Sequence, residues 1–442
     1  MALKERKPLG LVFFPAFDWA ISPTHPEREE RLLFTRDQVI EEGLLDLPQI
    51  REYKPCMASL ADMERVHIGV PDVASLIKAA HRVSAGGAIT AAEAVFKRET
   101  EKSFALVRPP GHHAMRVVHG TRGFCTINIE AVMVEYLRHK YGLRRVAIVD
   151  TDVHHGDGTQ DIYYHDPDTL FISFHQDGRT LYPGSGFPNE TGSPGALLST
   201  MNIPLPPGTT DEGMHMVLDE LVLPVLADFR PDMIINSAGQ DNHYSDPLAN
   251  MAVTAQGYAR LAEKLNADVA VLEGGYSIED ALPYVNVGII LAMAGLDYSR
   301  VLEPDLDRAP VQSASTTATI QKLIKEWRET WTVRERMKSD ALARAGDFWN
   351  RERDIYYDDS QILERQRETV HYCKRCNGLL TISTKSAGNR SVEKSAFAVI
   401  LGQDSCPVCR ERGKDALIHA KRAGIHQHYF LQDRREDSLE RI

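Results

Sequence analysis

A dense group of ionisable residues follows a run that is typical of a buried strand. Residues 146–149 are all apolar, and five of the next eight residues are Asp150, Asp152, His154, His155 and Asp157. Unpaired buried carboxylates cost free energy, so such a group has little structural use after a core strand. Asp152 and His154 point to the same side of an extended backbone, which suits two ligands of one metal ion. A polar turn with a capping aspartate is the alternative, but the crowding favours a site.

Further candidates lie just after other apolar runs. His112 and His113 follow a Pro-Pro-Gly turn, and two adjacent imidazoles can supply a general base and an electrostatic partner. Asp241 can be a third metal ligand, which leaves one coordination position open for water, as catalytic zinc requires. Tyr276 lies on a glycine turn that can project its phenol into a cleft. Taken singly, these residues would be ordinary surface, cap and turn residues. Their common place after predicted strands favours a shared site.

Four of the six cysteines form two C-x-x-C pairs, which are separated by residues 377–405 and consist of Cys373, Cys376, Cys406 and Cys409. Paired knuckles with Gly378 after the first predict a closed structural zinc site of the zinc-ribbon type. Free or disulfide-bonded cysteines are the alternative, but disulfides are rare in the cytosol. Cys56 and Cys125 stand alone, and we expect them to be reduced core residues.

The elements that must position these residues alternate between strands and helices. Apolar runs of strand length occur at 9–14, 104–107, 146–149, 169–174, 233–235 and 269–272, and helical patterns lie between them, as at 124–139 and 211–229. The helical spacing at 71–97 is broken at Gly86-Gly87, which predicts two helices or one interrupted helix. The alternation predicts an α/β fold of three layers (α/β/α), with a mainly parallel central sheet and the site at the carboxyl ends of its strands.

The length and a change in composition predict three parts. A chain of 442 residues is too long for one ordinary domain, and its composition changes after Leu302. We predict a catalytic domain at 1–302, a linker with an amphipathic helical segment at 303–369, and a zinc-ribbon-like C-terminal module at 370–442. An apolar stripe from Ile320 to Trp331 should pack against the catalytic domain. We expect the ribbon to be separable, so that its loss leaves the active-site chemistry largely intact.

The charge is unevenly distributed along the chain. Residues 301–442 contain 25 Lys and Arg against 22 Asp and Glu, whereas the whole chain has a net charge of −11. An acidic catalytic domain repels nucleic acid and favours cationic substrates. The tail is basic between residues 371 and 430, so contact with nucleic acid or with another copy of the chain in a homo-oligomer stays open. The absence of a signal-peptide pattern and of an apolar run of about 20 residues predicts a cytoplasmic protein with no membrane partner.

Five motifs occur in order between residues 9 and 300. They are Arg108-Pro-Pro-Gly-His-His-Ala114, Gly123-Phe-Cys125, Asp150-Thr-Asp-Val-His-His-Gly-Asp-Gly158, Ser237-Ala-Gly-Gln-Asp241 with Asp246-Pro-Leu248, and Leu272-Glu-Gly-Gly-Tyr276. This part of the chain resembles the histone deacetylase and acetylpolyamine amidohydrolase family, in its bacterial and class II branch. The resemblance implies the arginase–deacetylase fold. Family members do not generally have the cysteine-rich tail, so it gives no guidance there.

The resemblance also implies roles for single residues. The catalytic zinc would be bound by Asp152, His154 and Asp241. His113 would be the general base, and His112 would be its electrostatic partner. Asp150 and Asp157 would orient His112 and His113, respectively. Tyr276 would donate a hydrogen bond to the oxyanion. The acyl-lysine tunnel would be lined by Gly123, Phe124, Tyr182 and Gly275. A potassium ion would be bound through Asp150, Asp152, His154, Ser173 and Phe174.

Three features depart from the family pattern. The segment from His113 to Gly123 is longer than usual and adds Arg116, His119 and Arg122 near the tunnel mouth. Gln240 replaces a common Phe or Ala, and Tyr182 replaces the usual Phe of the tunnel wall. These departures leave the substrate preference open.

We therefore predict a zinc-dependent amide hydrolase that removes acetyl or a related acyl group from acyl-lysine in proteins. A close alternative is an amidohydrolase for acetylpolyamine or another small acylated amine. A catalytically silent acyl-lysine-binding protein would not need Tyr276, His113 and all three ligands. An arginase-like binuclear manganese hydrolase would need more bridging ligands. Ferrous iron in place of zinc stays open.

Overall fold

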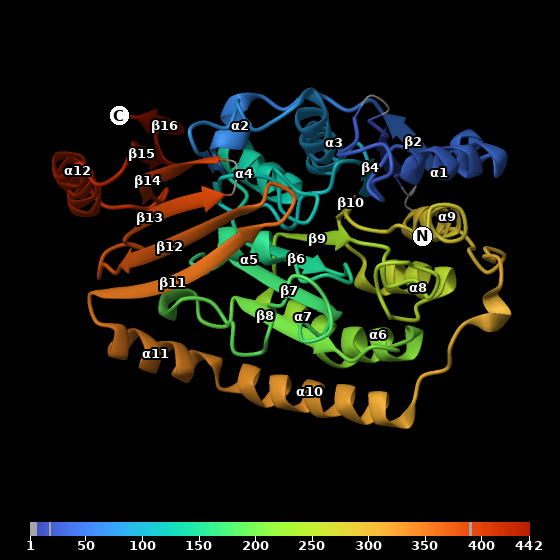
Figure 1. Ribbon diagram of the computed structural model, residues 1–442. Coiled ribbons are helices and arrows are strands. Elements are labelled where there is room, and N and C mark those ends of the chain that lie inside the picture. Colours follow the sequence, from blue (N-terminus) through green and yellow to red (C-terminus); the bar gives the residue numbers. More distant parts are fainter. Residues whose placement is uncertain (1–6, 17–18, 389–390) are drawn as a thin grey trace.

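The computed structural model describes residues 7–16, 19–388 and 391–442, which form two large sheets (Figure 1). All neighbouring strands of the first sheet are parallel. Their spatial order is β2 (Ile50–Tyr53), β1 (Leu9–Phe14), β4 (Lys102–Val107), β10 (Val269–Leu272), β9 (Met233–Ala238), β6 (Val146–Asp150), β7 (Thr169–Gln176) and β8 (Thr200–Leu205). A separate parallel pair consists of β3 (Ile68–Gly69) and β5 (Val117–Val118).

Helices cover both faces of the eight-stranded sheet, because successive strand residues face opposite sides. In β6, Ala147 and Val149 pack into one buried apolar cluster, whereas Val146 and Ile148 pack into another. The first cluster includes residues of α1 (Glu30–Glu41), α6 (Asp211–Val217), α7 (Leu223–Phe229), α8 (Ala255–Leu265) and α9 (Leu282–Ala294). The second includes residues of α2 (Leu60–Glu64), α3 (Ala79–Phe96), α4 (Ile129–Tyr141) and α5 (Asp157–Tyr163). The predicted three-layer α/β fold is confirmed, and we call this part the body.

Shorter helical segments connect these elements. They are the 3₁₀ turns η1 (Leu44–Asp46), η2 (Pro194–Ala196) and η4 (Leu306–Arg308), and the π-helical stretch η3 (Leu218–Val222) between α6 and α7. In the part of the chain that the structure describes, no helix has both the length and the apolar character needed to cross a membrane.

Two helices differ from their predicted extent. Gly86 and Gly87 lie inside α3, which is one continuous helix. A Cβ at Gly86 would collide with the carbonyl group of Cys56, so these glycines permit close packing and do not end the helix. The helix predicted from residue 124 begins only at Ile129, because the Asn128 side chain caps it by accepting a hydrogen bond from the N–H of residue 131 (2.8 Å). Residues 121–125, ahead of this helix, form a loop that we call the entrance loop.

After the body, two helices, α10 (Ala314–Thr332) and α11 (Arg334–Ala345), run along one side of the molecule (Figure 1). The apolar stripe of α10 packs as predicted, since Ile320, Ile324 and Trp327 are buried in the same apolar cluster as α6 and α8. The Trp327 indole also donates a hydrogen bond to the carbonyl of Asn202 in β8 (3.0 Å).

The second sheet has six strands in chain order and follows α11. They are β11 (Phe348–Tyr357), β12 (Ile362–His371), β13 (Leu379–Gly388), β14 (Ser391–Leu401), β15 (His428–Asp433) and β16 (Ser438–Arg441). Neighbours are antiparallel except β14 and β15, which α12 (Pro407–Ala423) connects in parallel. We call residues 348–442 the C-terminal sheet.

Residues 348–357 and 362–369 therefore lie in strands, where the sequence predicts linker and helix. The buried positions of β12 explain the difference, because Glu364, Gln366 and Glu368 are polar. No alternation of apolar and polar residues marks this strand in the sequence. The domain boundaries proposed from the sequence stay predictions.

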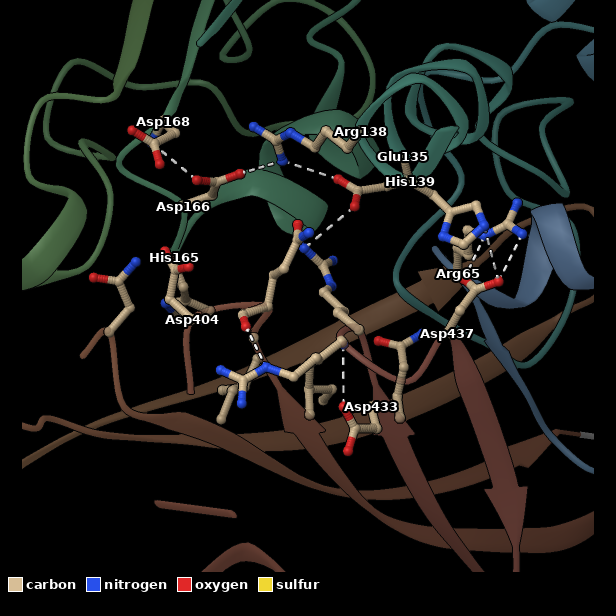
Figure 2. A pocket seen from close by; sticks show the side chains of 18 of the residues that line it. Arg65, Glu135, Arg138, His139, His165, Asp166, Asp168, Asp404, Asp433 and Asp437 are labelled. Atoms are coloured by element: carbon tan, nitrogen blue, oxygen red, sulfur yellow. Dashed lines mark hydrogen bonds and ion pairs between the residues drawn. The ribbon is translucent and has the colours of Figure 1, made fainter. Parts of the chain in front are cut away.

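The C-terminal sheet meets the body across a charged cavity of about 680 Å³ (Figure 2). Arg65 of the body donates to both carboxylate oxygens of Asp437, at 2.5 and 2.8 Å. Nearby, Arg434 of the C-terminal sheet lies 3.5 Å from Glu135 of the body. Charged contacts of this kind join the two parts of the chain.

Candidate active site

The strand ends bring the three predicted metal ligands together. Asp152 and His154 follow β6, and Asp241 follows β9. The Nδ1 atom of His154 lies 3.1 Å from a carboxylate oxygen of each aspartate, and the three ligand atoms lie within 4.8 Å of one another. Gly274, just after β10, allows this approach, because a Cβ there would collide with the Asp241 carboxylate. Its N–H also donates to Asp152 Oδ2 (2.8 Å).

These residues fit a catalytic zinc ion. Two carboxylates and one imidazole are three ligands of the kind zinc prefers, and they leave a position for water. Backbone groups orient both carboxylates, since the N–H of Val153 donates to Asp241 (2.9 Å) and that of His154 to Asp152 (2.8 Å). Among the described residues, the other group of this kind is the cysteine cluster of the C-terminal sheet.

The two adjacent histidines lie beside this triad with their ring centroids 4.1 Å apart. His112 Nδ1 is 3.1 Å from Asp150, and His113 Nδ1 is 2.7 Å from Asp157. Burial lowers the pKa of His112, but the charges of Asp152 and Asp150 outweigh it and raise the pKa well above its usual value. Burial and the neighbouring His112 lower the pKa of His113 to about 3. The pair therefore combines a cationic ring with a neutral one.

Tyr276 is held on a turn at the end of β10. Gly275 before it has a φ of +126°, a conformation that favours glycine. Asp246 accepts the N–H of Tyr276 (2.7 Å), and the Arg31 guanidinium lies over the phenol ring, 5.0 Å from its centroid. Burial raises the pKa of the Tyr276 phenol well above its usual value. The phenol keeps its proton and can donate it in a hydrogen bond.

The predicted tunnel residues lie around these groups. The Phe124 ring is 5.6 Å from that of Tyr276, and the Tyr182 ring is 5.2 Å from that of His113. Gly123 packs on the His113 ring so closely that a Cβ would collide with it. Aromatic rings thus pack against Tyr276 and His113, next to the triad.

Comparison with known proteins supports this geometry. Residues 71–288 match the model of the histone deacetylase domain. A probable deacetylase of Archaeoglobus fulgidus is 48% identical over 318 residues, which cover 64% of this chain and 85% of that protein. The chain belongs to the histone deacetylase family. An acetylpolyamine amidohydrolase of Burkholderia pseudomallei is 39% identical over 201 residues, or 44% of this chain and 57% of that protein. The crystal structure of the HDA15 HD domain has a TM-score of 0.65 at 26% identity, and the match covers 76% of this chain and 99% of that one.

This deacetylase is therefore a hydrolase of acetylated amides, from a family that is zinc-dependent. The fold and the family inferred from its five motifs are confirmed. The roles of its single residues stay predictions that the geometry supports.

The predicted potassium ligands also lie near one another. Asp150 and Ser173 are register partners in β6 and β7, and Phe174 follows Ser173. All three are buried, and the Ser173 hydroxyl lies 2.8 Å from His175 Nδ1. Potassium binding stays a prediction.

Sequence reasoning missed a buried charge network that supports the site. Arg108 forms two hydrogen bonds with the carboxylate of Glu27, both of 2.7 Å, and Arg31 binds the same carboxylate at 3.1 Å. Glu273 accepts the N–H groups of residues 111 and 112, at 2.7 and 3.0 Å, and so fixes the histidine turn. Arg108 and Glu273 lie inside two of the five family motifs, so the sequence did contain a signal that they belong to the site. Glu27 lies in a charged segment that looks solvent-exposed in the sequence.

The four cysteines of the C-terminal sheet converge as predicted. Cys373 and Cys376 lie between β12 and β13, and Cys406 and Cys409 lie at the start of α12. All four are free thiols whose sulfurs lie within 4.8 Å of one another. The N–H of Arg375 donates to Cys373 Sγ (3.4 Å), and this contact and Cys409 lower the pKa of the Cys373 thiol to about 6. Four convergent thiols fit a closed structural zinc site.

Proposed function

We propose that this deacetylase removes an acetyl or related acyl group from acyl-lysine in proteins, with a zinc ion bound by Asp152, His154 and Asp241. The observation that carries the proposal is the convergence of these three ligands beside Tyr276 and His113, whose ring lies 6.0 Å from that of His154. Zinc in such a site lowers the pKa of a bound water to about 7 and polarises the acyl carbonyl.

In this proposal His113 is the general base. Burial raises the pKa of Asp157, but Arg122 and His113 outweigh this effect and lower it. Asp157 is therefore a carboxylate, and it accepts a hydrogen bond from the Nδ1–H of His113. Nε2 of His113 is then free to take a proton from the attacking water and to return it to the leaving amine. His112, whose Nδ1 atom lies 3.1 Å from Asp150, would be the electrostatic partner of His113.

Tyr276 acts on the other reacting atom. Its phenol donates a hydrogen bond to the amide oxygen as that oxygen gains negative charge. Arg31 restrains the turn that carries it, by donating to the carbonyl groups of Gly275 (2.7 Å) and Glu273 (2.5 Å). The donor is therefore pre-positioned, which is what makes this kind of stabilisation effective.

Acyl-lysine is the proposed substrate because Phe124 and Tyr182 offer apolar walls for an extended alkyl chain. An acetylated polyamine is the second candidate, favoured by the acidic body and by the relative that is named acetylpolyamine amidohydrolase. A potassium ion at Asp150, Ser173 and Phe174, a cytoplasmic location, a homo-oligomer and nucleic-acid contact by the tail are further proposals of the same standing.

A side-by-side assay tests the substrate assignment. Purified full-length protein with measured zinc content is given an acetyl-lysine peptide, a longer acyl-lysine peptide and a monoacetylated polyamine, and amine release is followed. We expect the highest kcat/KM with one of the peptides. A higher value with the polyamine would select the second candidate. Peptide binding without hydrolysis of any substrate, at full zinc content, would contradict the proposal and favour a silent reader.

A further inference from the structure

We propose that the turn between β11 and β12 is part of the active site, with Asp358 and Asp359 as positioning residues for the entrance loop. The inference rests on the proposed function, because it concerns the same site. Figure 1 shows the β11–β12 hairpin, in orange, reaching from the C-terminal sheet over the body. Its turn follows Tyr357 and ends at Gln361, whose N–H donates to the carbonyl of Asp358 (3.2 Å).

Three consecutive side chains of this turn hold the backbone of the entrance loop. The N–H of Gly123 donates to Asp358 Oδ1 (3.1 Å), and that of Phe124 donates to Asp359 Oδ2 (2.9 Å). The N–H of residue 121 donates to the Ser360 hydroxyl (2.8 Å). Hydrogen bonds from backbone N–H groups to carboxylates are stronger than neutral ones, so the turn fixes the loop firmly.

The loop needs this support because of its conformation. Gly123 has a φ of +50° and Phe124 a φ of +67°, in the left-handed region that a bulky residue rarely adopts. The carboxylates of Asp358 and Asp359 accept the N–H groups of these two residues. They therefore stabilise the backbone conformation that places the Phe124 ring beside Tyr276.

A second set of contacts links the hairpin to the proposed general base. The carbonyl of Tyr356 accepts a hydrogen bond from the Arg122 guanidinium. Arg122 also donates twice to Asp157, at 3.0 and 2.6 Å, and Asp157 holds His113. On the opposite wall, the Tyr182 hydroxyl donates to Asp358 (3.1 Å). The hairpin thus contacts the tunnel walls directly and the base through two intermediates.

The segment that departs from the family pattern is the one that meets the C-terminal sheet. The two ring nitrogens of His119 lie 3.0 Å from the Thr384 hydroxyl and 2.8 Å from the Ser386 hydroxyl, both on β13. At Gly120, a Cβ would lie 2.5 Å from Oγ and 2.6 Å from Cβ of Ser360, so glycine is needed for the turn to approach. We infer that the longer segment and the C-terminal sheet serve one purpose, which is to shape the entrance.

The first test removes the carboxylates and then restores only their hydrogen-bonding capacity. In full-length protein, Asp358→Ala with Asp359→Ala should lower kcat/KM by about 10- to 100-fold, since a displacement of about 1 Å at a catalytic group has effects of that size. Asp358→Asn with Asp359→Asn should recover activity to within about 3-fold, because the amide oxygens still accept the two N–H groups. Asp354→Ala is the matched control, since Asp354 lies on the same strand and its side chain accepts from Arg365 (3.2 Å), away from the loop.

A second pair of variants tests the same contact from the side of the body. Gly120→Ala should push the turn away and lower kcat/KM by about 10-fold. Adding Ser360→Gly removes the atoms with which the new Cβ collides, so it should recover part of the lost activity. A merely structural role would change thermal stability and kcat/KM together, whereas a positioning role lowers kcat/KM in a protein that stays folded. Thermal unfolding and zinc content are measured for every variant, so that a loss of fold is recognised as such.

The outcomes separate this inference from the proposed function. If the wild-type protein hydrolyses no acylated amine, the proposed function fails. If the wild type is active and the double alanine variant matches it, the positioning role is overturned. A double alanine variant that is inactive because it is unfolded moves the decision to the Gly120 pair, where activity equal to the wild type in Gly120→Ala would overturn the inference. Low activity that asparagine or Ser360→Gly restores supports it.

Discussion

The aspartate–histidine triad and the four-cysteine cluster both present metal ligands, yet their surroundings differ. The triad is buried in the body, and its ligands come from the ends of two strands that are far apart in the sequence. Three of the four cysteines are partly exposed, and their neighbours are backbone N–H groups and apolar residues such as Leu379 and Val399. The triad also has His113 and Tyr276 beside it, and their pKa shifts leave the imidazole neutral and the phenol protonated.

This difference shows what separates a reactive centre from a structural one. The cysteine cluster offers four ligands and so would complete the coordination of a zinc ion. The triad offers three ligands, and the groups around it are placed to act on something that enters from outside. Ligand number and the presence of unused proton donors and acceptors therefore indicate function better than residue type does.

Removal of a triad ligand should have the largest effect on metal binding and on activity. We predict that His154→Ala lowers occupancy of the catalytic metal and abolishes hydrolysis, while the cysteine cluster keeps its zinc. Metal content per chain and amine release measure the two effects. Two carboxylates without the imidazole would also repel one another, so thermal unfolding is recorded alongside. Full activity at unchanged metal content would contradict the assignment of the site.

A smaller change leaves the metal ligands intact. Tyr276→Phe keeps the aromatic ring and removes only the hydroxyl, so kcat should fall by about 10²- to 10³-fold while zinc content and fold are retained. Tyr163→Phe is a control for the loss of a buried hydroxyl, since Tyr163 lies at the end of α5 and packs in the second apolar cluster of the body. Normal turnover by Tyr276→Phe would reduce Tyr276 to a packing residue.

The triad could be predicted from the sequence because its ligands lie in short motifs. Asp152 and His154 are two residues apart, and the strand pattern before them places both at the carboxyl edge of a parallel sheet. The contact of Asp359 with Phe124 spans 235 residues and has no local pattern. The buried face of β12 is polar, so the sequence pattern does not indicate this strand. Neither the hairpin nor its contact with the entrance loop could therefore be predicted. The sequence marks Arg122 as an addition to the family pattern, but it does not indicate that Arg122 contacts Tyr356.

That contact changes the expectation for the cysteine cluster. Cys376→Ser with Cys409→Ser should remove one zinc ion per chain and unfold residues near 370–412, because structural zinc contributes about 10–16 kcal/mol of apparent binding free energy in small peptides. The sequence alone predicts that activity is then largely intact. Since β12 runs from the entrance turn to the first cysteine knuckle, we now expect kcat/KM to fall by up to about 10-fold.

Metal analysis and kinetics of the cysteine variant are compared with Cys56→Ser, which changes a free cysteine of the body. Unchanged zinc stoichiometry in the double variant would contradict the structural zinc site. Loss of both zinc ions from a folded protein would mean that the catalytic and the structural zinc sites are not independent.

The weakest effect is expected where Arg65 joins the body to the C-terminal sheet. Hydrogen bonds from Arg65 lower the pKa of Asp437, near which His139 Nε2 also lies, at 3.5 Å. A carboxylate whose pKa is lowered on folding stabilises the fold above its ordinary pKa of about 3.9 and loses that contribution as pH falls through the folded value. Because the pair is partly exposed, Asp437→Asn should cost no more than about 1 kcal/mol of unfolding free energy at pH 7, and less at high salt. Urea unfolding at pH 7 and at successively lower pH, with Glu440→Gln as an exposed control on β16, should show a difference that shrinks below pH 4. A difference that is independent of both pH and salt would mean that Asp437 acts by packing alone.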